Sequence, residues 1–150
     1  MKLLMKAHSI QGVVFNGIPK YIHSNVMLDP LGKLNIGNNV VISTNVTILT
    51  HDYSYTVGLL ATNQTPTTDV AIFKPVNIGN NTFIGANSVI LPGSNIGDYC
   101  VIGAGCVIKG NVENYSIMLG NPAHKIGDTR IWGKDVLKKF NQNEIHYDNK

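Results

Sequence analysis

Isoleucine recurs every six residues through the middle of the chain, at Ile78, Ile84, Ile90, Ile96, Ile102 and Ile108. The residue two places before each later isoleucine is small or short: Thr82, Ser88, Ser94, Cys100 and Cys106. A period of six fits neither the repeat of a helix nor the alternation of a single strand, and a fixed hexad is typical of a parallel β-helix. We therefore expect each hexad to form a short strand and a corner, and three hexads to close one triangular coil around the isoleucines.

The same phase extends upstream and is interrupted once. It includes Ile36, Ile42 and Ile48, and a looser part at Ile22 and Leu28 is separated from Ile36 by a two-residue slip. The repeat stops between Tyr53 and Pro75 and resumes at Ile78, thirty residues after Ile48. Because thirty is a multiple of six, this long loop is expected to leave and re-enter the coil at equivalent positions. Loops of this length inside a compact fold are usually functional or disordered.

The two ends of the chain are less regular. Residues 1–21 are interpreted as an irregular lead-in with a short strand over residues 13–15, and residues 22–127 as the β-helix domain, with its loop at about 53–75. Val136, Leu137 and Phe140 lie on one face at helical spacing, which predicts a short helix in the tail of residues 128–150. This helix is expected to start near Lys134 or Asp135. The predicted fold is thus an all-β parallel β-helix with one long excursion and a C-terminal helix.

Composition and charge narrow the function. Hydrophobic residues make up 43% of the chain and charged residues only 14%, which suits a compact repeat protein. A net charge of +3 is too small to indicate nucleic-acid binding, but it suits an anionic small molecule. No apolar run is long enough for a membrane span, and the start MKLLMKAHSI has no signal-peptide pattern, so a cytoplasmic protein is expected. Cys100 and Cys106 occupy the small inward position and are interpreted as buried thiols.

The hexad run of Ile-Gly-x-x-small-x resembles the hexapeptide-repeat acyltransferases. This resemblance implies a left-handed β-helix, acetyl-CoA as co-substrate, no metal, and a homotrimer with active sites between its subunits. The string THDYS, followed by a long loop and then KPVNIGNN, is most similar to the sugar O-acetyltransferases of polysaccharide gene clusters. A sugar or saccharide acceptor is therefore implied as the partner of acetyl-CoA.

His51 is the candidate for the chemistry, because it lies where the repeat gives way to the long loop. A rigid coil can hold its ring, and histidine suits proton abstraction near neutral pH. As one of five histidines it is a weak signal by itself. The resemblance implies that His51 removes the proton of an acceptor hydroxyl while the oxygen attacks the thioester. Asp52 is the candidate to orient the imidazole, but neighbours on a strand point in opposite directions, so a role in the loop or toward another subunit stays open.

The resemblance also implies where acetyl-CoA binds. In the family, main-chain groups at small residues after the repeat glycine bind the pantetheine arm, and the matching positions are Ala86 and Ala104. They are eighteen residues apart, so they should stack in successive coils about 4.8 Å apart. Cations near the end of the coil are candidates for the phosphates: Lys109, His124, Lys125 and Arg130.

Four residues are candidates for the acceptor side of the site. Phe83 matches an aromatic residue that lines the site in related sugar acetyltransferases, although packing in the core or at an interface would explain it equally. His23, Asn25 and Asp29 lie on the earlier coil, in the region where the family binds its acceptor.

Three other functions are considered. An N-acetyltransferase acting on a nucleotide-linked amino sugar would use the same scaffold and the same base. A γ-type carbonic anhydrase would need three zinc-binding histidines, two of them about one coil apart, and no such pair occurs among His8, His23, His51, His124 and His146. A non-catalytic β-helix serving as a structural or assembly module is disfavoured by His51, the loop and the basic turn.

Overall fold

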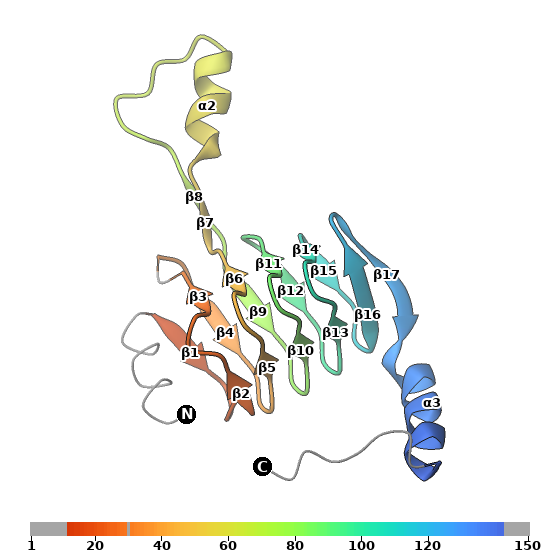
Figure 1. Ribbon diagram of the computed structural model, residues 1–150. Helices are drawn as coiled ribbons and strands as arrows, with labels where there is room; N and C mark the ends of the chain where they lie inside the picture. The colour runs from red at the N-terminus through yellow and green to blue at the C-terminus, as the bar shows by residue number, and fades with distance from the viewer. Residues whose placement is uncertain (1–11, 30, 143–150) are drawn as a thin grey trace.

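The computed structural model describes residues 12–29 and 31–142, and over these residues the chain forms the predicted parallel β-helix (Figure 1). Three sheets of short parallel strands are the faces of the coil. Sheet A contains β1 (Val13–Phe15), β4 (Leu34–Ile36), β9 (Val76–Ile78), β12 (Asn95–Ile96) and β15 (Asn111–Val112). Sheet B contains β2 (Tyr21–Ile22), β5 (Val41–Ile42), β10 (Phe83–Ile84), β13 (Val101–Ile102), β16 (Ser116–Gly120) and the antiparallel β17 (Ala123–Asp128). Sheet C contains β3 (Met27–Leu28), β6 (Thr47–Ile48), β11 (Val89–Ile90) and β14 (Val107–Ile108).

The hexad isoleucines fill the interior, as predicted. The register places Ile84 between Ile42 and Ile102, and Ile90 between Ile48 and Ile108. All these side chains are at most 1% exposed, and each fully buried aliphatic side chain contributes about 1.5–3 kcal/mol of transfer free energy. The small residues of the repeat are buried beside them, and Cys100 and Cys106 are free thiols in this core.

The outer surfaces of the three sheets differ in chemistry. Sheet A carries a column of asparagines whose side chains are hydrogen-bonded from coil to coil: Asn35, Asn77, Asn95 and Asn111. The outward column of sheet B is apolar and consists of Tyr21, Val41, Phe83, Val101 and Ile117. Sheet C is mostly apolar, with Met27, Thr47, Val89 and Val107. Only sheet A therefore has a face that is polar throughout most of its length.

The long loop is an arm that stands out from the coil body (Figure 1). It starts with β7 (His51–Asp52), which pairs antiparallel with β8 (Ile72–Phe73), and α2 (Ser54–Ala61) lies between them. Residues 51–75 are called the excursion below, and none of them is buried. The helix α2 was not predicted, because its sequence SYTVGLLA places no apolar stripe along one side and buries no residue.

The ends differ in detail from the sequence prediction. β1 pairs in register with β4, so the coil begins before residue 22. At the other end, α3 (Thr129–Asn141) starts earlier than Lys134, because the Asp128 side chain caps it by accepting a hydrogen bond from the Arg130 N–H. No helix in the described part of the chain is long and apolar enough to cross a membrane.

Candidate active site

The corner between sheets C and A brings a carboxylate and an imidazole together. β3 and β6 are neighbours in sheet C, with Leu28 beside Ile48, so the residues that follow these strands meet in space. The two-residue slip after Leu28 lengthens the lower corner and leaves Asp29 beneath Thr50 and His51. Asp29 Oδ2 lies 2.5 Å from His51 Nδ1. The side chain of Asp29 is only 4% exposed, whereas that of His51 is 25% exposed.

Asp29 is held by hydrogen bonds on both carboxylate oxygens. Oδ1 accepts from the Leu31 N–H at 3.0 Å, and Oδ2 accepts from the Thr50 N–H at 2.7 Å and the Thr50 hydroxyl at 2.8 Å. Burial by itself would raise the pKa of Asp29, but these hydrogen bonds and the one to His51 outweigh it and lower the pKa to about 2. Asp29 is therefore an anion at neutral pH.

The charge on Asp29 determines how His51 can act. An ionised carboxylate can only accept a hydrogen bond, so Nδ1 of His51 carries the proton and donates it to Asp29. In neutral His51 the lone pair is then on Nε2, the nitrogen that Asp29 does not engage. The ring is flanked by Tyr53 and Phe73, with ring centroids 5.4 and 6.1 Å away. This arrangement leaves Nε2 of neutral His51 able to accept a proton.

The two aspartates of the sequence prediction make different contacts in the structure. Asp29, predicted to contact the acceptor, forms a hydrogen bond with His51. Asp52 was the candidate to orient His51, but its Oδ1 accepts a hydrogen bond from the Ser54 N–H at 2.8 Å, and this bond is the main cause that lowers the pKa of Asp52. Asp52 therefore shapes the start of α2. The sequence feature that could have identified Asp29 as the partner of His51 is the two-residue slip. The longer corner that it creates beneath His51 leaves room for a side chain to reach the imidazole.

Asp52 and Lys109 line a hollow on the other side of the β7–β8 hairpin. Its volume is about 340 Å³, and Ser54, Tyr55 and Lys74 also line it. Lys109 belongs to the same C–A corner as His51, in a later coil. Of the predicted cofactor residues, Lys109 is therefore the one that shares the C–A corner with His51.

Ala86 and Ala104 occupy a different corner, the one between sheets B and C. They follow β10 and β13, which pair in register, and the Gly105 N–H donates to the Ala86 carbonyl at 2.8 Å. The predicted stacking in successive coils is therefore present. Ala104 is exposed and Ala86 partly so, so a ligand can reach both.

The remaining predicted phosphate-binding residues lie near β17 and α3. Lys125 Nζ forms an ion pair with Glu113 Oε2 at 3.1 Å. The Arg130 guanidinium binds both oxygens of Asp128, at 3.0 and 2.6 Å, and lies 4.3 Å above the Tyr115 ring. The hydrogen bonds from Arg130 lower the pKa of Asp128 to about 2. His124 is exposed on β17. None of these three residues is placed beside His51.

His23 and Asn25 lie at the B–C corner of the first coil and do not contact His51. The Asn25 N–H donates to His23 Nδ1 at 3.3 Å, and the Asn25 amide is bonded to the Asn45 side chain and accepts from the Thr44 hydroxyl. Asn45 continues this ladder to Asn87. Asn25 therefore stabilises the stacking of coils within this chain.

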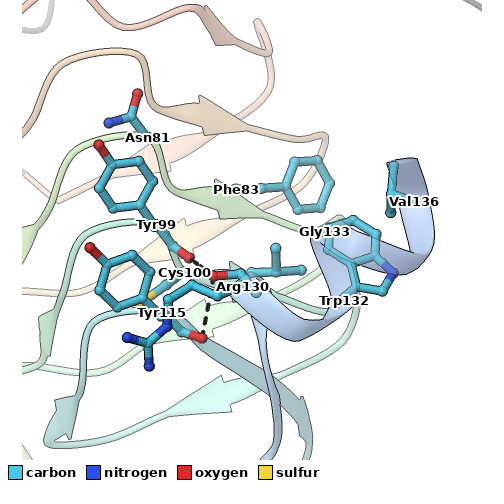
Figure 2. Close-up of a pocket in the computed structure, with 11 residues that line it drawn as sticks. Asn81, Phe83, Tyr99, Cys100, Tyr115, Arg130, Trp132, Gly133 and Val136 are labelled. Carbon is cyan, nitrogen blue, oxygen red and sulfur yellow. Dashed lines mark hydrogen bonds between the residues drawn. The ribbon is translucent and has the colours of Figure 1, made fainter. Parts of the chain in front are cut away.

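Phe83 points outward from sheet B into an aromatic groove beside α3 (Figure 2). The groove has a volume of about 320 Å³, and Tyr99, Tyr115 and Trp132 are among its lining residues. Tyr99 and Tyr115 stack with their centroids 5.2 Å apart. Phe83 therefore packs near α3 within its own chain, at a distance along the surface from the C–A corner.

The described residues contain no cluster that would support the zinc site of a γ-type carbonic anhydrase. Among residues 12–29 and 31–142, no three His, Cys, Asp or Glu side chains gather where they could hold an ion. His8 and His146 lie outside those ranges.

Comparisons with a family model and with known proteins both find similarity to hexapeptide-repeat transferases. Residues 75–110 match the model described as bacterial transferase hexapeptide (six repeats). Galactoside O-acetyltransferase of Escherichia coli K12 is 31% identical over 131 residues, which cover 77% of this chain and 58% of that protein. The chain spans about half the length of the curated relatives it matches.

Solved structures of other acetyltransferases share the fold. A maltose O-acetyltransferase from Clostridium difficile 630 has a TM-score of 0.62 at 28% identity, covering 77% of this chain and 70% of that one. A galactoside acetyltransferase in complex with coenzyme A has a TM-score of 0.63 at 25% identity, covering 98% of this chain and 76% of that one.

Proposed function

We propose that this chain, which belongs to the hexapeptide-repeat transferases, moves an acetyl group from acetyl-CoA to a hydroxyl group of a sugar or polysaccharide precursor, with His51 as the general base. The observation that carries the proposal is the 2.5 Å contact between His51 Nδ1 and the buried Asp29 carboxylate. The names of the galactoside and maltose O-acetyltransferase relatives support the sugar acceptor. The coenzyme A bound to one of them supports the donor.

The proposed reaction is a direct transfer. Nε2 of His51 takes the proton from the acceptor hydroxyl as its oxygen forms a bond to the thioester carbonyl carbon. Negative charge develops on the carbonyl oxygen, where backbone N–H groups at the coil edge can stabilise it. The carbon–sulfur bond then breaks, and protonated His51 returns the proton to the CoA thiolate. No residue of the enzyme is acylated.

Asp29 is proposed to support both halves of this proton transfer. While His51 is neutral, Asp29 fixes the tautomer that leaves Nε2 free. When His51 becomes a cation, the Asp29 anion stabilises the imidazolium without taking its proton, because the low pKa of Asp29 favours the ionised form. Thr50 contributes by binding the same carboxylate oxygen through its N–H and its hydroxyl.

The proposed assembly is a homotrimer with sites between subunits. The candidate residues of one chain fall into two sets, with His51, Asp29 and Lys109 on the C–A corner and Ala86 and Ala104 on the B–C corner. One acetyl-CoA that contacts both sets is most simply held between the C–A corner of one copy and the B–C corner of the next. The apolar outer columns of sheets B and C provide two different surfaces, which a closed ring of copies requires.

A thiol-release assay tests the reaction. Wild type and His51→Ala are incubated with acetyl-CoA and a panel of sugars, nucleotide sugars and amino sugars, and far-UV circular dichroism checks folding. We expect acceptor-dependent release that falls by about 100-fold or more in His51→Ala. Unchanged turnover in the folded variant would rule out His51 as the base. No release with any acceptor, together with no CoA binding by calorimetry, would favour a non-catalytic module, and acceptance of amino sugars alone would favour N-acetylation.

A second measurement tests the assembly. Light scattering after gel filtration should give three chains per particle. Val101→Asp, which places a charge on the outer column of sheet B, should reduce both the particle mass and the activity. A monomeric wild type with full activity would contradict the shared site.

A further inference from the structure

Two aromatic side chains flank the imidazole of His51 and are not explained by packing. The Tyr53 ring meets the imidazole edge to face, at an interplanar angle of 77°, whereas the Phe73 ring is inclined to it by only 28°. Tyr53 is 48% exposed and Phe73 54% exposed. Neither ring belongs to the hydrophobic core, so packing in the core does not explain their placement.

The hairpin at the base of the excursion places these rings on the side of His51. β7 and β8 pair antiparallel, with His51 opposite Phe73 and Asp52 opposite Ile72. Residues directly opposite each other in an antiparallel pair point to the same face. Phe73 and His51 therefore share one face, and Asp52 and Ile72 share the other, which lines the hollow with Lys109.

The chemistry of the two reactants indicates which of them uses the rings. The reacting end of acetyl-CoA is a thin, flexible thioester arm without a ring. A pyranose has a flat side of C–H groups, which its oxygen atoms make slightly positive, and the face of an aromatic ring is slightly negative. Stacking also removes apolar area from water. Aromatic rings next to a general base therefore suit a cyclic acceptor better than the thioester.

We propose that Tyr53 and Phe73 form a stacking platform that selects a pyranose ring as the acceptor and presents one of its hydroxyl groups to Nε2 of His51. The inference rests on the proposed function and specifies its substrate class. A ring held against Phe73 has a restricted orientation, so its hydroxyl is positioned for proton transfer, whereas an open-chain polyol with the same hydroxyls is not. Tyr53 and Phe73 act here as specificity-determining residues, and the base remains His51.

The test compares cyclic and open-chain acceptors in matched variants. Thiol release from acetyl-CoA is measured with the methyl pyranosides of glucose, galactose and mannose, and with sorbitol, galactitol and mannitol. The variants are Phe73→Leu, Phe73→Trp and Tyr53→Leu. Leu60→Ala is the control, because Leu60 is also on the excursion and is 53% exposed, but has no ring contact with His51. Calorimetry with CoA checks that each variant still binds the donor.

We expect wild type to prefer at least one pyranoside over its polyol, and each leucine variant to raise the KM for that pyranoside about 3- to 10-fold, with little change for the polyol. Phe73→Trp should restore the preference, and Leu60→Ala should leave it unchanged. Equal losses for pyranosides and polyols, or a shifted pH profile with the preference intact, would show that the rings only support the imidazole and would overturn the inference. Absence of release with every acceptor in wild type would overturn the proposed function and this inference with it.

Discussion

The coil body and the excursion differ in where they place their apolar side chains. In the body, buried isoleucines line the interior from Ile22 to Ile108, and the register repeats from strand to strand. In the excursion, no residue from 51 to 75 is buried, and large apolar side chains such as Tyr53, Val57 and Phe73 face outward. Apolar side chains in the coil body stabilise the fold, whereas those in the excursion are available to contact a ligand or another protein chain.

The candidate site lies where these two regions meet. Asp29 and Thr50 belong to the rigid corner of the body, and His51 begins the excursion. The body can therefore fix the carboxylate that orients the imidazole, while the aromatic residues around the ring stay accessible. A site of this kind needs both a support that does not move and a surface that is not already occupied.

The largest effect that separates the two regions is expected from Ile102→Ala. Ile102 is fully buried between the neighbouring coils, so the substitution should lower the free energy of unfolding by about 2–5 kcal/mol. Leu60→Ala in the excursion should change it by less than about 0.5 kcal/mol. Urea unfolding at one protein concentration measures both. A similar cost at the two positions would mean that the excursion is packed in solution and would remove the contrast.

The second prediction concerns acid. The folded pKa of Asp29 is about 2, below its ordinary value of 3.8, so the unfolded chain binds more protons between these values. The stabilising contribution of Asp29 is complete above about pH 4 and is lost as the pH falls through about 2, and it amounts to about 2–3 kcal/mol. The difference in unfolding free energy between wild type and Asp29→Asn should shrink by that amount from pH 7 to pH 2. A difference that is independent of pH would contradict the low pKa.

The third prediction sharpens the choice between the two aspartates. Asp29→Asn should lower kcat about 10- to 100-fold, because an amide can present an N–H to Nδ1 and favour the wrong tautomer. Asp52→Asn should change kcat by no more than about twofold, as for a surface substitution. Thiol-release kinetics with a saturating acceptor measure both variants. A larger loss in Asp52→Asn would restore the adjacent residue as the orienting group.

The coil could be predicted from the sequence because its repeat relates residues that are six positions apart, and this spacing can be read directly from a single sequence. The partner of His51 could not, because Asp29 is twenty-two residues away and the slip after Leu28 hides the register that brings them together. Helix α2 could not be predicted either, since it buries no face and so carries no periodic pattern. The start of α3 was missed because its cap, Asp128, precedes any apolar stripe.

A smaller loss of stability than for Ile102→Ala is expected on the polar face of the coil, where Asn77→Ala breaks the asparagine column of sheet A. The Asn77 side chain accepts from Asn35 at 2.6 Å and donates to Asn95 at 2.5 Å. Both neighbours can turn to water after the substitution, so no buried polar group is left unpaired and the cost should be about 1 kcal/mol. Urea unfolding measures it, with the activity unchanged because sheet A carries no candidate site residue. A loss of several kcal/mol, or a loss of activity, would show that the asparagine face is covered in the assembly. The difference between the polar face of sheet A and the apolar faces of sheets B and C would then not determine which faces form the contacts between subunits.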